Sequence, residues 1–258
     1  MKYGVCGEPG IATILAEAGY DYIELHVERD LQTGKDETAF KPQLAQLQAL
    51  AVPPSAANCF LPGSLKITGP DVDPQALKRY ATTAFDRAER TGIETIVFGS
   101  GGARRVPEGF DRQDAWAQLL DFGRMIAPIA AEHGITVVVE PLNRRECNIF
   151  NSVGESADYV RQIGHPHLRL LVDAYHWALE KDSYEDLVEV MPLIQHAHIA
   201  TYESRMAPGL EACDFSSFAQ ALREGGYDGR LSIEGRWTDM GREAAGALAE
   251  LKRAIEGG

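Results

Sequence analysis

The feature that most constrains the fold of this chain is a repeated alternation of short apolar runs with longer amphipathic stretches. The short runs have the length and the β-branched character of strands, and the stretches between them have helical periodicity. Strands that alternate with helices pair in parallel, so an α/β fold is expected. The strand-like runs lie at residues 3–6, 22–26, 55–60, 95–98, 136–140, 169–173, 196–200 and 230–234.

Helical patterns fill the intervals between these runs. The clearest cover residues 39–51, 75–92 and 113–134, and the second ends on a glycine, Gly92, as a C-cap does. Eight strand–helix units in 258 residues match a (β/α)8 TIM barrel in size, and no linker divides the chain. We therefore predict a single TIM barrel over residues 1–258. Later helical patterns lie at 154–164, 183–191, 215–226 and 242–258.

An open, doubly wound sheet is the alternative, and it calls for a glycine-rich phosphate loop after the first strand. The segment CGEPGIA (6–12) has two glycines but not the GxGxxG pattern. The segment FGSGGARRVPEGF (98–110) fits neither that pattern nor the Walker A motif. Its Arg104 and Arg105 are suited to gripping a phosphate, although a solvated loop is the favoured interpretation. The barrel remains the prediction.

Composition narrows the cellular setting. No apolar run reaches the roughly 18 residues of a membrane span, and the N-terminus lacks the apolar core of a signal peptide. The four cysteines are far apart and form no CxxC pair, which is typical of reduced thiols. We expect a cytoplasmic protein without a membrane partner. A net charge of −13 argues against nucleic acid as a partner.

Charged and polar residues stand at the ends of the last four predicted strands. Glu140 ends the apolar run that starts at Ile135, and a buried carboxylate is costly unless it is paired or coordinated. Asp173, His198 and Glu234 lie at the ends of the next three runs. Because the carboxyl ends of barrel strands meet at one rim, these side chains are expected to converge.

Each of these residues alone has a structural explanation, since Asp173, for example, is placed to cap the following helix. Together, three carboxylates on one rim would repel one another and raise one another's pKa. A divalent cation removes that conflict. Three oxygen donors and an imidazole suit Mn²⁺, Mg²⁺ or Co²⁺ better than Zn²⁺. We predict that one such cation binds Glu140, Asp173, His198 and Glu234.

Several segments resemble the xylose-isomerase-like TIM barrels, the superfamily of sugar phosphate isomerases and epimerases. Within that superfamily the sequence is most similar to the ketose 3-epimerases and the hydroxypyruvate isomerases. In the N-terminal half the similarity is carried by AGYDYIELH (18–26). In the C-terminal half it is carried by VEPLNRRE (139–146), VDAYHW (172–177), HAHIA with RMAPG (196–209) and GYDGRLSIE (226–234).

The resemblance implies that the four rim residues bind a divalent metal, often Mn²⁺. It also implies that Glu146, His176 and Arg205 contact the oxygens of a small carbohydrate substrate, and that the protein forms a dimer or tetramer. Arg205 follows His198 by seven residues, where the epimerases usually have six, but its spacing to the Met-Ala-Pro-Gly segment after it is kept. Glu24 and His26 are weaker candidates for the far end of the pocket.

The chemistry that this set suggests is proton transfer beside a carbonyl. A metal stabilises the enediolate as a Lewis acid, and a carboxylate moves the proton. Glu140 and Glu234 lie on non-adjacent strands, so we hypothesise that they flank the sugar and act as the catalytic pair. Transfer on opposite faces inverts a carbon, whereas transfer by one glutamate between neighbouring carbons gives aldose–ketose isomerisation. Both outcomes remain open.

Two other functions remain open at this point. The same proton removal can end in β-elimination, which would make the protein a metal-dependent lyase or dehydratase acting on a keto-sugar or 3-keto-glycoside. A non-catalytic sugar-binding barrel is the alternative of a different class, although it would not need a full metal set. The DNA-cleaving AP endonuclease type of the superfamily is disfavoured, because strand three offers Asn58 and no histidine.

Overall fold

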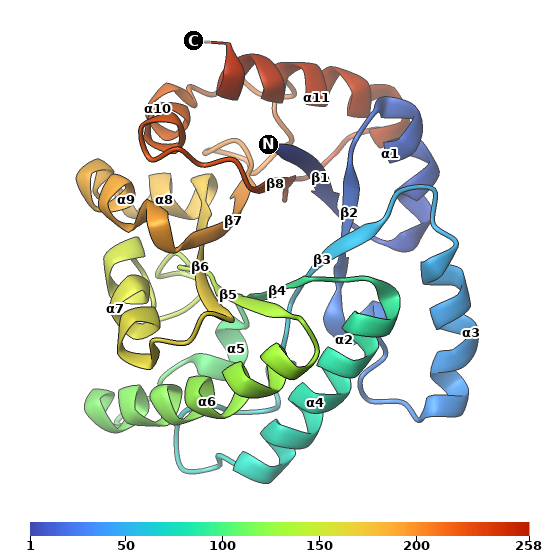
Figure 1. Ribbon diagram of the computed structural model, residues 1–258. Coiled ribbons are helices and arrows are strands. Elements are labelled where there is room, and N and C mark those ends of the chain that lie inside the picture. Colours follow the sequence, from blue (N-terminus) through green and yellow to red (C-terminus); the bar gives the residue numbers. More distant parts are fainter. Residues whose placement is uncertain (258) are drawn as a thin grey trace.

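The computed structural model of the protein describes residues 1–257 and contains a closed barrel of parallel strands (Figure 1). Strand order follows the chain, and β1 pairs with β8 to close the barrel. The predicted (β/α)8 TIM barrel is confirmed. Its strands are β1 (Lys2–Cys6), β2 (Tyr22–His26), β3 (Pro54–Asn58), β4 (Thr95–Phe98), β5 (Thr136–Val139), β6 (Leu168–Asp173), β7 (Ile194–Ile199) and β8 (Arg230–Ile233).

Helices surround the barrel, and the last helix packs beside the first to complete the ring (Figure 1). They are α1 (Ala12–Ala18), α2 (Val27–Asp30), α3 (Glu37–Gln48), α4 (Pro74–Thr91), α5 (Gly101–Arg104), α6 (Arg112–Glu132), α7 (Val153–Ile163), α8 (Ala174–Glu180), α9 (Tyr184–Val190), α10 (Ser216–Glu224) and α11 (Met240–Glu256), with short 3-10 turns at Pro9–Ile11 and Met191–Leu193.

Helix ends follow from local capping. The Asp73 side chain accepts hydrogen bonds from the backbone N–H groups of Gln75 and Ala76, and Asp111 caps α6 in the same way. The C-cap predicted at Gly92 is confirmed, because this residue ends α4 with a φ of 92°. That left-handed conformation costs glycine little. These caps fix the residues at which α4 and α6 begin and at which α4 ends.

The inside of the barrel is divided into an apolar and a polar half. Val97, Val138 and Leu171 form a small apolar cluster of their own on β4, β5 and β6. Across the barrel, Glu24 of β2 and His196 of β7 are fully buried and hydrogen-bonded to each other. The polar half therefore lies on the side of the barrel where β8 meets β1.

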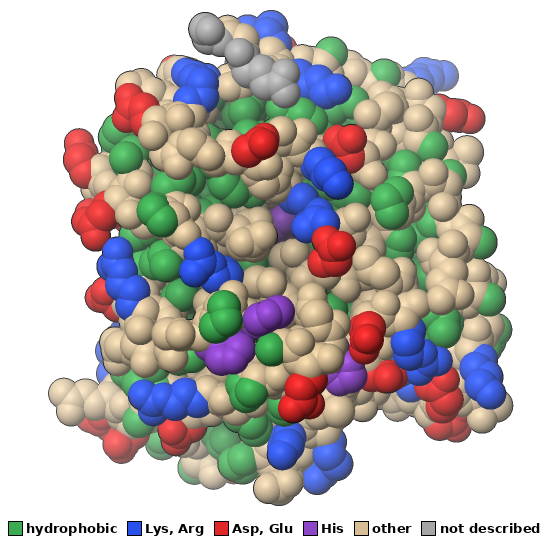
Figure 2. Space-filling view, viewed as in Figure 1, with side chains coloured by type: hydrophobic (Ala, Val, Ile, Leu, Met, Phe, Trp, Pro, Cys, Tyr) green, Lys and Arg blue, Asp and Glu red, His purple; other side chains and the backbone are tan. Residues whose placement is uncertain are grey.

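The surface shows no dominant charge pattern on the face seen in Figure 2. Acidic and basic side chains are interspersed there. Among the described residues, no helix has the length and apolarity to cross a membrane. The predicted cytoplasmic location stays a prediction.

Candidate metal centre and substrate cleft

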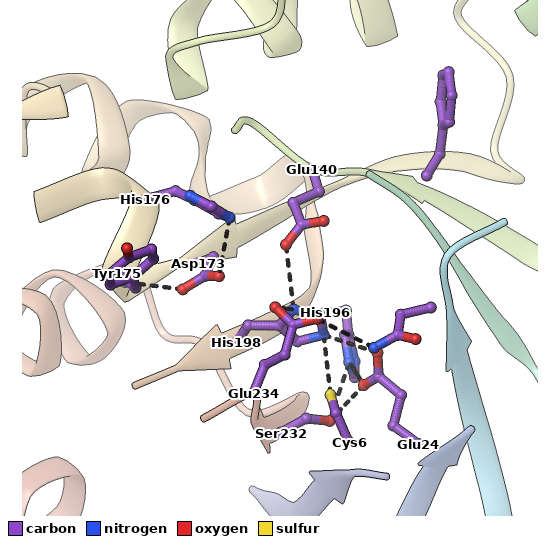
Figure 3. Close-up of polar contacts among 12 residues, drawn as sticks. Cys6, Glu24, Glu140, Asp173, Tyr175, His176, His196, His198, Ser232 and Glu234 are labelled. Atoms are coloured by element: carbon purple, nitrogen blue, oxygen red, sulfur yellow. Dashed lines mark hydrogen bonds and ion pairs between the residues drawn. The ribbon is translucent and has the colours of Figure 1, made fainter. Parts of the chain in front are cut away.

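The four rim residues predicted as metal ligands lie together in the structure (Figure 3). Glu140 directly follows β5, Asp173 ends β6, His198 lies in β7 and Glu234 directly follows β8. One donor atom from each lies within 4.8 Å of the others. The parallel barrel produces this convergence, because it brings the carboxyl ends of β5 to β8 to one rim.

The two ring nitrogens of His198 face different partners. Nδ1 lies 3.3 Å from Glu140 Oε1 and 3.5 Å from Glu234 Oε2, so it points into the cluster. Nε2 lies 2.9 Å from Glu24 Oε1, below the cluster. A metal-binding histidine is commonly oriented by a carboxylate on its second nitrogen. Glu24 occupies that place here, which leaves the Nδ1 lone pair free for a cation.

Glu24 belongs to a buried network rather than to the far end of the pocket, where the sequence had suggested it. Its Oε2 lies 2.8 Å from His196 Nε2 and accepts a hydrogen bond of 2.6 Å from the Ser232 hydroxyl. Burial raises the pKa of Glu24, but His198 and His196 outweigh burial and bring the pKa well below its usual value. The carboxylate is thus held charged beneath the cluster.

One carboxylate oxygen of Asp173 accepts a hydrogen bond, and the other does not. Its Oδ1 accepts a 2.8 Å hydrogen bond from the Tyr175 N–H, so Asp173 does cap the helix that follows it. Its Oδ2 is buried and has no hydrogen-bond partner among residues 1–257. The nearest basic atoms, His176 Nε2 and Arg205 Nη2, are each 3.6 Å away. Unpaired buried acceptors are rare, and a cation would satisfy this one.

Glu140 and Glu234 are in different electrostatic environments. Burial raises the pKa of Glu140, and the neighbouring Glu234 adds to the rise. Burial also raises the pKa of Glu234, but His198 and Arg205 outweigh it and lower the pKa to about 2. The excess of carboxylates over bases in this cluster is what a divalent cation neutralises.

Two features of the loop after β4 fix the position of Glu140. The guanidinium of Arg104 is fully buried and donates to the carbonyl oxygens of Phe98 and Glu140, at 2.8 and 2.6 Å. The favoured interpretation of Arg104 as part of a solvated loop is therefore wrong. Gly99 lies against the Glu140 carboxylate, since a Cβ added at Gly99 would stand 2.3 Å from Oε2.

Glu146, His176 and Arg205 line a cleft of about 480 Å³ above the cluster, together with Glu140 and Glu234. Glu146 and Arg205 face each other, with Arg205 Nη1 3.5 Å from Glu146 Oε1. Arg205 also pairs with Glu234 and lies over the Tyr175 ring at 4.8 Å. The structure thus places all three predicted substrate contacts in the cleft.

The backbone at Arg205 is strained. Its φ is 54°, in the left-handed region that non-glycine residues seldom occupy. Such a conformation costs on the order of 1–3 kcal/mol and persists where the surroundings enforce it. Arg205 lies in the cleft and contacts Glu234, although it follows His198 by seven residues.

Asn143 and Asn58 are site residues to which the sequence assigned no role. Asn143 Nδ2 donates to His176 Nδ1 at 2.9 Å, so the ring proton of a neutral His176 is on Nε2, which lies 3.6 Å from Asp173 Oδ2 and 3.9 Å from Glu146 Oε2. Asn58 Nδ2 donates to Glu234 Oε1 at 3.2 Å. Both asparagines stand near strand ends. A position near a strand end was the signal that could have identified them. Their partners, His176 and Glu234, are distant in sequence, so the contacts themselves could not be predicted.

Comparison with known proteins assigns the chain to a family. Residues 12–256 match the model of the xylose isomerase-like TIM barrel, and the chain belongs to that family. D-psicose 3-epimerase of Enterocloster bolteae is 25% identical over 84% of this chain and 72% of its own. 3-Dehydro-D-guloside 4-epimerase of Escherichia coli is 32% identical, over 44% of this chain and 43% of its own.

A solved structure shows the same fold along the whole chain. The structure of D-psicose 3-epimerase with D-tagatose from Clostridium cellulolyticum H10 superposes with a TM-score of 0.85, at 19% identity. It covers 99% of both chains. With the relatives named above, which are epimerases, the family places the protein in the isomerase and epimerase class of enzymes.

Proposed function

We propose that the protein is a divalent-metal-dependent sugar epimerase that acts as the ketose 3-epimerases do, through proton transfer alpha to a carbonyl. The observation that carries the proposal is the meeting of four donor atoms, one from each predicted ligand, under a cleft lined by Glu146, His176 and Arg205. Asp173 Oδ2, which is buried, has no hydrogen bond within the described residues. Similarity to D-psicose 3-epimerase over most of the chain supports the choice of a ketose.

Glu140, Asp173, His198 and Glu234 would hold the cation, with Mn²⁺ as the first choice. When bound, a divalent cation supplies Lewis-acid stabilisation of the negative charge that develops as the sugar loses its proton. The donor set fits such an ion, because its three carboxylates and one Nδ1 leave positions open for substrate oxygens.

The remaining steps use the side chains of the cleft. Arg205 and the Nε2–H of His176 donate hydrogen bonds to sugar oxygens, and Glu146 accepts one from a hydroxyl. These contacts orient the reacting C–H bond between Glu140 and Glu234. One glutamate removes the proton from one face, and the other returns a proton to the opposite face, which inverts the carbon.

Isotope exchange tests this function. The Mn²⁺-loaded protein is incubated with D-psicose, D-fructose and D-tagatose in D₂O, and deuterium at C3 is followed by NMR. Epimerisation predicts deuterium at C3 together with the epimeric sugar, while a dehydrating lyase would eliminate water from the substrate and give an unsaturated product. Because each glutamate moves a proton, Glu140→Gln and Glu234→Gln should each lower turnover by about 10²–10⁴-fold.

Glu132→Gln, which removes an exposed carboxylate at the end of α6, is the matched control and should leave turnover unchanged. Near-normal turnover in both active-site variants would refute the proposal. Metal content, measured in every variant, separates loss of the cation from loss of proton transfer.

A further inference from the structure

A second cavity adjoins the substrate cleft. It has a volume of about 720 Å³ and lies between α2, the loop 31–35 and the first half of α4. The cleft and this second cavity share His26, Glu28 and Pro62 as lining residues, so the two spaces are direct neighbours. Ligand cavities occupy roughly 300–1,000 Å³. Each of the two spaces therefore suffices for a ligand, and the pair exceeds what one simple sugar fills.

The walls of the second cavity are held in place by hydrogen bonds and by an ion pair. The buried Arg87 donates to the carbonyl oxygens of Leu31 and Lys35, at 3.0 and 2.8 Å, and so fixes the loop. Arg29 is held by Asp30 through two hydrogen bonds of 2.7 Å. The cavity thus keeps its shape without a ligand, which reduces the cost of ordering it on binding.

The walls of the second cavity carry polar groups that a ligand can bind. Gln32 Oε1 is buried and has no hydrogen-bond partner within residues 1–257. The Thr33 side chain and the Tyr80 hydroxyl interact with each other, which opposes the rise in the pKa of Tyr80 that burial causes. Buried polar atoms are normally satisfied. A free acceptor beside two hydroxyls indicates a ligand that both donates and accepts hydrogen bonds.

The second cavity combines charged and neutral polar groups. Lys35 and Arg79 lie in its lining together with Glu28, and the charge of Arg29 is paired with Asp30. Hydroxyl and amide groups beside the Tyr80 ring suit a sugar, which has an apolar face and many hydroxyls.

We infer that the second cavity binds a glycosyl group attached to the sugar whose reacting end lies in the cleft. The substrate class would then be a glycosylated keto-sugar rather than a free hexose. This inference rests on the proposed function for the identity of the reacting end. None of the lining residues of the second cavity is among the proposed metal ligands or proton-transfer groups.

The test compares D-fructose with its 4-O- and 6-O-glucosyl derivatives on the Mn²⁺-loaded protein. Binding is measured by calorimetry and turnover by deuterium exchange. At least one glucosyl derivative should bind about tenfold more tightly than fructose. Ala76→Trp fills the cavity and should remove that advantage, while the binding and turnover of fructose stay unchanged. Lys78→Trp, on the exposed side of the same helix, should behave as wild type.

Tyr80→Phe removes one hydroxyl without adding bulk and should weaken the binding of the glucosyl derivative by about fivefold. It keeps the test decisive if the tryptophan variant does not fold. Equal affinity of fructose and both derivatives for the wild type, or equal weakening of all sugars in the variants, overturns the second site. Selective binding without exchange at any carbon would instead refute the epimerase proposal and leave the second site standing.

Discussion

Individual residues in this barrel owe their roles to partners that are distant in the chain. Glu24 and His198 are separated by 174 positions, yet their side chains meet at 2.9 Å. The sequence pattern indicated that His198 lies near the end of a strand, but it did not indicate which ring nitrogen faces the other predicted metal ligands. The same holds for Arg104. A charged residue in a glycine-rich loop is expected to be solvated, and only the structure shows that its guanidinium donates to two backbone carbonyl oxygens.

The contact between Glu24 and His198 leads to a prediction about metal affinity. Glu24→Gln removes the charge that orients the imidazole, so the Mn²⁺ dissociation constant should rise by about 10- to 100-fold. Ser232→Ala, which deletes one hydrogen bond to Glu24 without touching His198, should change it much less. Titration calorimetry measures both. An unchanged dissociation constant in Glu24→Gln would show that Glu24 does not orient His198.

At the scale of elements, the strands were more predictable than the helices. The β-branched runs at β4 and β5 are buried on both sides, and their predicted and observed limits agree to within one residue. The short helices α1 and α8 were not predicted. Each has seven residues, too few for a clear helical period, and α8 directly follows the apolar strand β6.

The loop between β4 and α5 leads to a second prediction. Gly99→Ala places a methyl group within 2.3 Å of Glu140 Oε2, and the carboxylate must move to accommodate it. We expect Mn²⁺ affinity and turnover to fall by about tenfold or more, since misplacement by an ångström costs up to 10²-fold. Far-ultraviolet circular dichroism should show the same helix content as wild type.

Gly10→Ala is the matched control, because a Cβ there would meet no atom within 4 Å in the described part of the chain. It should leave metal affinity and turnover at the wild-type level. If Gly99→Ala also behaved as wild type, Glu140 would have more freedom than the structure indicates.

For the whole molecule, the barrel and the family were predictable from the alternation of elements and from four C-terminal segments. The limits of the domain, 1–258, stay a prediction, as do the dimer or tetramer and the absence of a nucleic-acid partner. The second cavity was not predictable, because its walls combine residues from β2, α2, α4 and two loops. Periodic sequence patterns predict strands and helices, but they do not predict which loops lie next to each other at the rim of a barrel.

Metal binding should also change the stability of the entire barrel. A ligand at 100 times its dissociation constant stabilises the folded state by about 2.7 kcal/mol. For a protein of this size that raises the melting temperature by about 5–10 °C. Differential scanning calorimetry with Mn²⁺ and with a chelator measures the shift. Asp173→Asn should reduce it sharply, and an equal shift in that variant would place the ion elsewhere.

The seam where β8 meets β1 has a consequence for how the protein is made. Glu234 joins the cluster from the last strand, while Glu24, which orients His198, comes from the second. A ribosome-bound chain that has not yet emerged beyond residue 234 lacks one of the four donors. Under the proposed function, the complete cation site therefore forms only after Glu234 has left the ribosome.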